Sequence, residues 1–188
     1  MNIYVYRFGE GKEKPASDQL LRLSLSSYNK EKQIGLSEKN VEEIEILRTE
    51  KGRPYFKSLP VEFSISHSAN VWACAMGDCP VGLDVQKNKE AKTIEIAKRF
   101  FTKQEADFIA NHDSKIFFQI WTRKEAVVKF TGEGIGFGFD KFSVVDSGGF
   151  MENLQWPCEC HVESLSIFEH FECCICTQKK EKVWIKEL

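Results

Sequence analysis

Long apolar runs and net charge are both scarce in this sequence. No apolar run approaches the roughly 20 residues that a helix needs to span a bilayer, so we expect no membrane partner. The formal net charge is only −2, so the molecule lacks the overall positive field that attracts nucleic acid or anionic membranes. We therefore expect no nucleic-acid partner either, and an acidic partner has to be met by a local basic patch.

Signal-peptide and linker patterns are missing as well. Residues 1–8 alternate like a strand and lack the basic and then apolar layout of a signal peptide. We therefore expect a cytoplasmic protein. The 188 residues contain no obvious linker or low-complexity segment, and their 42% hydrophobic content is enough for a buried core. These properties fit one large domain or two small domains packed together.

Zinc-type spacing is absent although the chain has seven cysteines. Zinc sites usually draw on pairs with C-x2-C or H-x3-H spacing, and neither cysteine cluster near the end of the chain has it. On strands, Cys158 and Cys160 share one face and so do Cys174 and Cys176, whereas Cys173 points the other way. We expect buried, reduced cysteines; a cysteine-rich metal-binding or interaction module is a further alternative.

The sequence contains a mixture of helix and strand patterns that do not alternate strictly. Helices are expected at residues 17–29, 37–48, 92–101, 103 onward and 115–130. A capping box, formed by Thr102 and Glu105, begins the fourth of these helices, so we interpret Glu105 as structural. Phe117, Phe118 and Trp121 are interpreted as core residues. Strands at 63–68, 71–76 and 81–86 favour a short antiparallel meander, and the predicted fold class is α+β.

Charged side chains gather on the helix at residues 121–129 and on the strand at 81–86. On the helix, Glu125 and Lys129 share a face because they are four residues apart, and Lys124 lies at its edge. On the strand, Asp84 and Gln86 share the polar face. If the helix packs across that face, Asp84 and Glu125 bring together two carboxylates, the hard oxygen ligands that magnesium prefers. A solvated charged surface is the alternative.

Five motifs occur in a fixed order along the chain. They are Gly-Arg-Pro at 52–54, Phe-Ser-Ile-Ser-His-Ser at 63–68, Val-Gly-Leu-Asp at 81–84, Phe-Phe-Thr-Lys-Gln-Glu at 100–105 and Trp-Thr-Arg-Lys-Glu-Ala-Val-Val-Lys at 121–129. From Gly52 to Phe142 this order resembles the 4′-phosphopantetheinyl transferases, and most closely their larger, pseudo-dimeric branch, of the type that activates surfactin synthetase. The set is specific because of its order, whereas a lone K-E-x-x-x-K would carry no information.

The resemblance implies an enzyme that transfers the phosphopantetheine arm of coenzyme A to a serine of an apo acyl or peptidyl carrier protein. Adenosine 3′,5′-bisphosphate is the other product, and Mg²⁺ is the implied cofactor. The implied fold has two similar halves, residues 1–79 and 80–188, each a small antiparallel sheet with packed helices. Coenzyme A binds in the cleft between them. A coenzyme A-binding protein without transferase activity is the alternative.

The resemblance also assigns residues to roles. The implied magnesium ligands are Asp84 and Glu125, the phosphate-binding lysines are Lys124 and Lys129, the strand at the 3′-phosphate carries Ser66 and His67, and the loop near the adenine carries Arg53 and Pro54. Charge stabilisation by such a metal and lysines is usually the largest catalytic term. We hypothesise that Glu125 takes the proton of the carrier serine, with Lys129 as its catalytic partner.

Two positions depart from the pattern of the family. Many relatives have Asp-x-Glu where this chain has Asp84-Val85-Gln86, so the third metal position holds a neutral amide and we expect weaker magnesium affinity. The basic positions that relatives place ahead of the Gly-Arg-Pro loop have no clear counterpart, and Arg22 is only a weak candidate.

An acidic carrier protein is the implied partner, and the resemblance places its docking surface on the segment from Gly132 to Glu163. This segment is not basic, so electrostatic attraction is expected from other residues, namely Lys98, Arg99, Lys103 and Arg123. A pseudo-dimeric chain completes its own cleft, so we expect a monomer.

Overall fold

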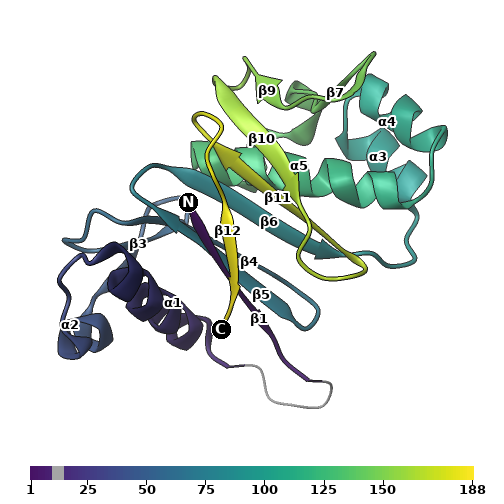
Figure 1. Cartoon of the computed structure of the whole chain (residues 1–188). Coiled ribbons are helices and arrows are strands. Elements are labelled where there is room, and N and C mark those ends of the chain that lie inside the picture. The colour runs from purple at the N-terminus through teal and green to yellow at the C-terminus, as the bar shows by residue number, and fades with distance from the viewer. Residues whose placement is uncertain (10–14) are drawn as a thin grey trace.

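The first half of the molecule is a four-stranded sheet covered on one face by helices (Figure 1). The computed structural model describes residues 1–9 and 15–188 of the chain. In sheet order the strands are β12 (Trp184–Glu187), β1 (Asn2–Arg7), β5 (Val71–Gly77) and β4 (Glu62–Ser68). Only the β1–β12 pair is parallel. Helices α1 (Ser17–Lys32) and α2 (Glu38–Glu43) complete this half.

Helix α1 packs on the sheet through a face of leucines. Leu20, Leu21 and Leu25 are buried against the sheet's Trp72. The second predicted helix is shorter than expected, because residues after α2 form an antiparallel hairpin instead. Its strands are β2 (Ile46–Arg48) and β3 (Pro54–Phe56).

The second half is another four-stranded antiparallel sheet. Its strands, in sheet order, are β6 (Val81–Lys87), β11 (Phe171–Thr177), β10 (Cys160–Leu165) and β9 (Asn153–Leu154). Helix α5 (Lys115–Thr131) crosses one face of this sheet, and α3 (Thr93–Phe100) and α4 (Lys103–Ala110) pack beside it (Figure 1). Shorter elements follow α5: the 3-10 turns η1 (Ile135–Phe137) and η2 (Phe139–Lys141) and the hairpin β7 (Val145–Asp146) with β8 (Gly149–Phe150). The α+β class is confirmed.

Gly82 sets how closely α5 lies on β6. A Cβ atom at this position would come within 1.9 Å of the Ala126 carbonyl oxygen and 2.6 Å of the Phe130 nitrogen, both of which are backbone atoms of α5. Only glycine allows this approach. The helix ends at Thr131, and Gly132, with a φ of 71°, forms its left-handed C-cap.

Local predictions in the second half are confirmed. Thr102 and Glu105 form a reciprocal capping box at the start of α4. Phe117 and Phe118 are buried, and Trp121 packs against the aromatic rings around them. All seven cysteines are free. Cys174 and Cys176 lie in the core under α5, whereas Cys173 lies in the core between the two sheets, so the predicted alternation of faces is also correct.

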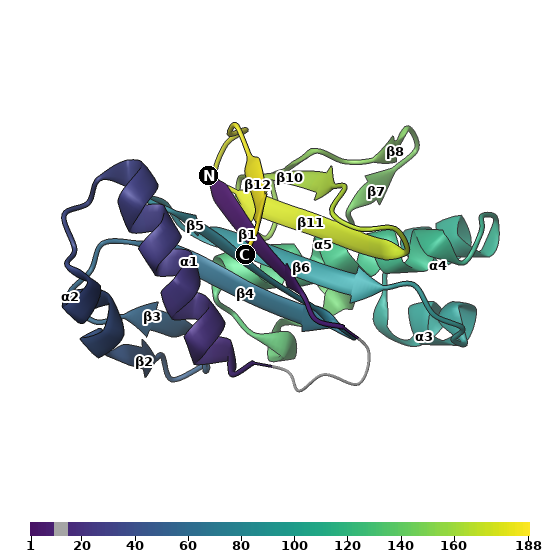
Figure 2. The same cartoon turned by 60° about the horizontal axis from the view of Figure 1, so that its bottom comes forward.

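The two sheets are joined by a seam of serine hydroxyls rather than by a continuous ladder. Ser64, Ser66 and Ser68 of β4 accept hydrogen bonds from the backbone N–H groups of residues 83, 85 and 87 of β6, at 3.0, 3.1 and 3.0 Å. Unpaired N–H groups on an edge strand are costly when buried, and the hydroxyls satisfy them. Figure 2 shows β4 and β6 side by side. The expected meander is therefore correct for β4 and β5 only, because β6 is paired with β11.

The last strand returns to the first half. Strand β12 pairs with β1, and the amino group of Met1 donates to the Lys182 carbonyl oxygen at 3.0 Å. A division of the chain at residues 79 and 80 would place β12 in the second half, whereas its hydrogen bonds place it at the edge of the first sheet. No helix in residues 1–9 and 15–188 is both long enough and apolar enough to cross a membrane.

Candidate functional site

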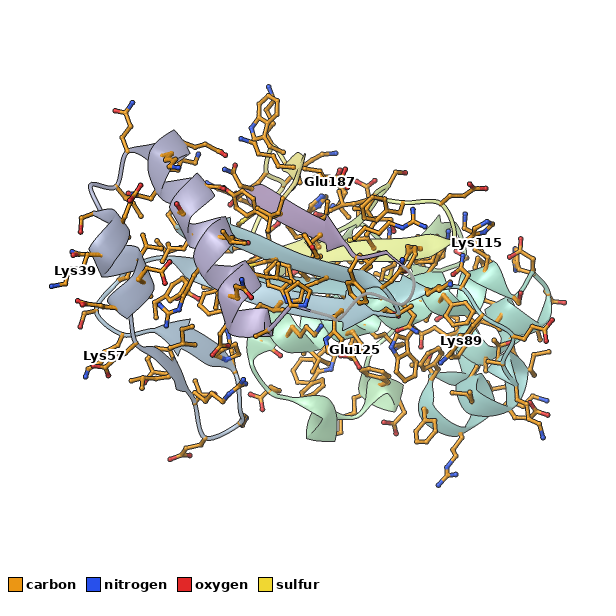
Figure 3. The ribbon with its side chains drawn as sticks, turned by 90° about the horizontal axis from the view of Figure 1, so that it is seen from below. Lys39, Lys57, Lys89, Lys115, Glu125 and Glu187 are labelled. Carbon is orange, nitrogen blue, oxygen red and sulfur yellow. The ribbon has the colours of Figure 1, made fainter. Side chains whose placement is uncertain are left out.

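A cavity of about 470 Å³ lies between the two halves. Its walls are the β2–β3 hairpin and β4 of the first half and the C-terminal part of α5 of the second half. The structure brings together here five residues that the sequence singles out: Arg53, Pro54, His67, Glu125 and Lys129. Glu125 lies centrally below the sheets in Figure 3.

Glu125 is the acid of this cavity, and its environment disfavours its charge. Burial, and secondly the negative charge of Asp84, raise the pKa of its carboxyl to about 7, against the opposing effect of Lys129. The group is therefore poised near neutrality, where a carboxyl can accept and release a proton. The same environment favours any cation that binds beside it.

Asp84 is held where the two halves meet. Its Oδ1 accepts a hydrogen bond from the Ser66 hydroxyl at 2.7 Å and forms an ion pair with Lys129 Nζ at 2.8 Å. Lys129 Nζ also donates to the carbonyl oxygens of Leu83 and Ile65, at 3.0 and 3.4 Å. The hydrogen bonds from Ser66 and Lys129 both end on Oδ1.

The donor set fits a magnesium ion that is completed by other ligands. Asp84 and Glu125 supply carboxylate oxygens, and the half-exposed Gln86 follows on the face of β6 that carries Asp84. Magnesium prefers such oxygens and commonly keeps several waters or phosphate oxygens in its shell. Within the described residues no group of three or more His, Cys, Asp or Glu is placed to hold a metal alone. Burial and the charge of Asp84 raise the pKa of Glu125, and a divalent cation bound beside it would offset both effects.

The opposite end of the cavity is basic. Arg53 Nη2 donates to Glu62 Oε2 at 2.9 Å, and Arg48 Nη1 donates to the Gly52 carbonyl oxygen at 3.0 Å. Lys51 also lines this end. Arg48 and Lys51 were not among the predicted site residues, although they lie close to the Gly52 turn in the sequence.

Lys124 does not line the cavity, although Glu125, the next residue in the sequence, does. Its fully buried ammonium forms an ion pair with Glu105 at 2.8 Å and donates to the carbonyl oxygens of Phe139 and Phe142. Burial lowers the pKa of Lys124, and Glu105 partly offsets this. The residue thus ties α4 and the segment after α5 to the helix. It differs from Glu125 because adjacent helical residues point about 100° apart.

Two other basic residues also differ from their expected positions. Arg22 donates to the carbonyl oxygens of Val41 and Ile44, within the first half and outside the cavity. Arg123 is buried and donates to the Met151 carbonyl oxygen, so it adds no charge to the surface. The remaining residues of the predicted basic set are exposed on α3 and α4: Lys98, Arg99 and Lys103.

Comparisons with known proteins show which family this chain resembles. The profile of the 4′-phosphopantetheinyl transferase superfamily matches residues 80–176. The chain is similar to a 4′-phosphopantetheinyl transferase of Bacillus subtilis, at 36% identity over 68% of this chain and 60% of the relative. It is also similar to 4′-phosphopantetheinyl transferase psf-1 of Bacillus pumilus, at 32% identity over 71% of this chain and 61% of the relative. The chain thus covers less than two thirds of the length of these curated relatives.

Proposed function

Because this chain belongs to the 4′-phosphopantetheinyl transferase superfamily, we propose that it transfers the phosphopantetheine arm of coenzyme A to an apo acyl or peptidyl carrier protein. One observation carries the proposal. Glu125 and Lys129 line the cavity between the halves, and Lys129 reaches from it to Asp84. One end of the cavity thus combines Glu125, whose pKa is about 7, with Lys129 and a second acid, Asp84. The other end is basic.

In the proposed reaction the carrier serine Oγ attacks the phosphorus that bears the pantetheine arm. A phosphoester bond forms, the bond to the bridging pyrophosphate oxygen breaks, and adenosine 3′,5′-bisphosphate leaves. Glu125 accepts the serine proton as the general base. Lys129 stabilises the negative charge that develops on the phosphate oxygens.

Magnesium is the proposed cofactor, with Asp84 and Glu125 as protein ligands and the amide oxygen of Gln86 as a third. When bound, it supplies positive charge to the pyrophosphate. The seam keeps Asp84 in place for this role, because Ser66 and Lys129 hold the same carboxylate oxygen.

The basic end of the cavity is proposed to bind the nucleotide. Arg53 and Pro54 lie on the hairpin proposed to meet the adenine, and His67 lies on the strand proposed to meet the 3′-phosphate. The Ser66 hydroxyl is engaged by Asp84 and by the Val85 N–H group, so we assign it the placement of that strand.

The proposed carrier surface runs from Gly132 to Glu163, beside the C-terminal end of α5. The exposed residues Lys98, Arg99 and Lys103 supply the attraction for an acidic carrier. Since both walls of the cavity come from one chain, a monomer suffices for the site.

The experiment that tests the proposal incubates the protein with apo carrier protein, coenzyme A and Mg²⁺ and measures the intact mass of the carrier. We expect a gain of one phosphopantetheine group with the wild-type protein and none with Glu125→Gln. The alternative, coenzyme A binding without transfer, predicts calorimetric binding without any mass gain. No mass gain with any carrier protein of the host would overturn the transferase proposal, and near-normal turnover of Glu125→Gln at saturating Mg²⁺ would overturn its role as the base.

A further inference from the structure

An ion pair connects the two walls of the cavity at its mouth. Lys51, in the turn between β2 and β3, contacts Glu133 Oε2, in the turn after α5, at 2.5 Å. The residues that flank this pair, Gly52 on one side and Gly132 and Gly134 on the other, line the cavity. The pair therefore joins two segments of the cavity wall that come from different halves.

The two turns meet at this point through more than one contact. A Cβ atom on Gly132 would lie 3.9 Å from Nη1 of Arg53, which is two residues after Lys51. The halves are thus linked along β4 and β6 by the buried serine seam and at the cavity mouth by an exposed ion pair. Exposed ion pairs contribute only about 0–1 kcal/mol to stability, so the pair can exchange its partner at little cost.

The β2–β3 hairpin and its turn carry three cationic side chains on the cavity wall. Arg48, Lys51 and Arg53 lie within a few residues of one another and all line the cavity. Glu62, from β4 of the same half, pairs with Arg53. Among these three cations, and within the described part of the chain, only Lys51 forms an ion pair with a carboxylate of the opposite half, Glu133. Its ion pair therefore crosses the opening of the cavity.

We propose that Lys51 is a phosphate-binding residue that Glu133 holds at the cavity mouth until a ligand phosphate takes it over. The inference rests on the proposed function, because it assumes a ligand with phosphate groups in this cavity. A phosphate dianion offers more charge and more acceptor oxygens than one carboxylate, and charge-assisted bonds to it are correspondingly strong. Since Glu133 competes with the ligand for Lys51, its removal favours binding.

The test is isothermal titration of coenzyme A into the wild-type protein and into Lys51→Met and Glu133→Gln. Without its carboxylate competitor, Glu133→Gln is expected to bind coenzyme A about twofold to fivefold more tightly, as the energies of exposed pairs allow. Lys51→Met is expected to bind about tenfold more weakly, in line with the loss of a charge-assisted hydrogen bond. Adenosine 3′,5′-bisphosphate, titrated in parallel, should show the same order if the phosphates of the nucleotide are what Lys51 contacts.

The neighbouring pair Lys57–Glu45 is a matched control. Its ion pair measures 2.8 Å, its side chains are 52% and 59% exposed, and those of Lys51 and Glu133 are 53% and 47% exposed. Lys57 does not line the cavity and lies far from Glu125 in Figure 3. Lys57→Met and Glu45→Gln are expected to match the wild type in affinity and to resemble the test variants in thermal stability.

The outcomes separate the two proposals. If the wild type binds coenzyme A but Lys51→Met and Glu133→Gln bind it as the control variants do, the role of Lys51 is refuted and the proposed function stands. If Glu133→Gln weakens binding as much as Lys51→Met, the pair is a permanent part of the wall and the exchange is refuted. If the wild type binds no coenzyme A, both proposals fail together.

Discussion

Replacing Glu125 by glutamine should change how the stability of the protein depends on pH. The folded state raises the pKa of this carboxyl from 4.5 to about 7, chiefly by burial and secondly by the charge of Asp84. Between these two values the folded protein holds the proton more tightly than the unfolded chain does, so the free energy of unfolding falls as pH rises. The penalty is complete above pH 7, and glutamine, which carries no charge, removes it.

The size of the effect follows from the pKa rise. At about 1.4 kcal/mol per pH unit, a rise from 4.5 to about 7 corresponds to an upper bound of about 3 kcal/mol. Glu125 is only partly buried beside the cavity, and screening there reduces the expected gain to about 1–2 kcal/mol. Glu125→Gln should therefore be more stable than the wild type by this amount at pH 8, and the two should converge near pH 4.

Urea unfolding from pH 4 to pH 8.5, in the presence of a chelator, measures this difference directly. Glu45→Gln, which removes an exposed carboxylate that does not line the cavity, should show no comparable convergence. With Mg²⁺ in place of the chelator, the wild type should regain stability at pH 8 by binding the cation, whereas Glu125→Gln should gain less. A difference between variant and wild type that stays constant with pH, or a variant less stable at pH 8, would refute the proposed electrostatics of this site.

Three further substitutions test the packing and the metal site. Gly82→Ala should cost about 3 kcal/mol or more in urea unfolding, because its Cβ would strike the Ala126 carbonyl oxygen; wild-type stability would disprove the close approach. Lys124→Met should lower the free energy of unfolding by about 3–5 kcal/mol, because it leaves Glu105 buried without its ion-pair partner. Adding Glu105→Gln should restore part of that loss. An equal loss in the double variant would show that the two residues do not form a stabilising pair. Gln86→Glu should raise the affinity for Mg²⁺ measured by thermal shift, and an unchanged affinity would remove residue 86 from the ligand set.

Local patterns predicted the elements that carry the site. The bounds of α5, the capping box of α4 and the two faces of β6 follow from helical and strand periodicity together with glycine and capping residues. These features depend on neighbours within a few residues. The sequence was therefore sufficient to place Glu125 and Lys129 on one helix face, and the cavity contains both.

Features that depend on distant partners could not be predicted in this way. Strand β6 pairs with β11, about 90 residues later in the chain, and nothing in the local alternation distinguishes this from a meander with β5. The burial of Lys124 depends on where α4 places Glu105. The sequence pattern of Lys124 followed by Glu125 is the same whether the lysine faces a ligand or the core.

The serine seam links the fold to the chemistry proposed for it. Ser66 donates to Asp84 Oδ1 and accepts from the Val85 N–H group, so one hydroxyl both closes the edge of β6 and positions an acid of the site. Lys129 approaches the same oxygen from α5, which Gly82 allows to lie close against β6. One serine of the seam that joins the halves thus also fixes the carboxylate. Any change that loosens this junction should alter metal binding and Glu125 ionisation even where it leaves the two separate cores intact.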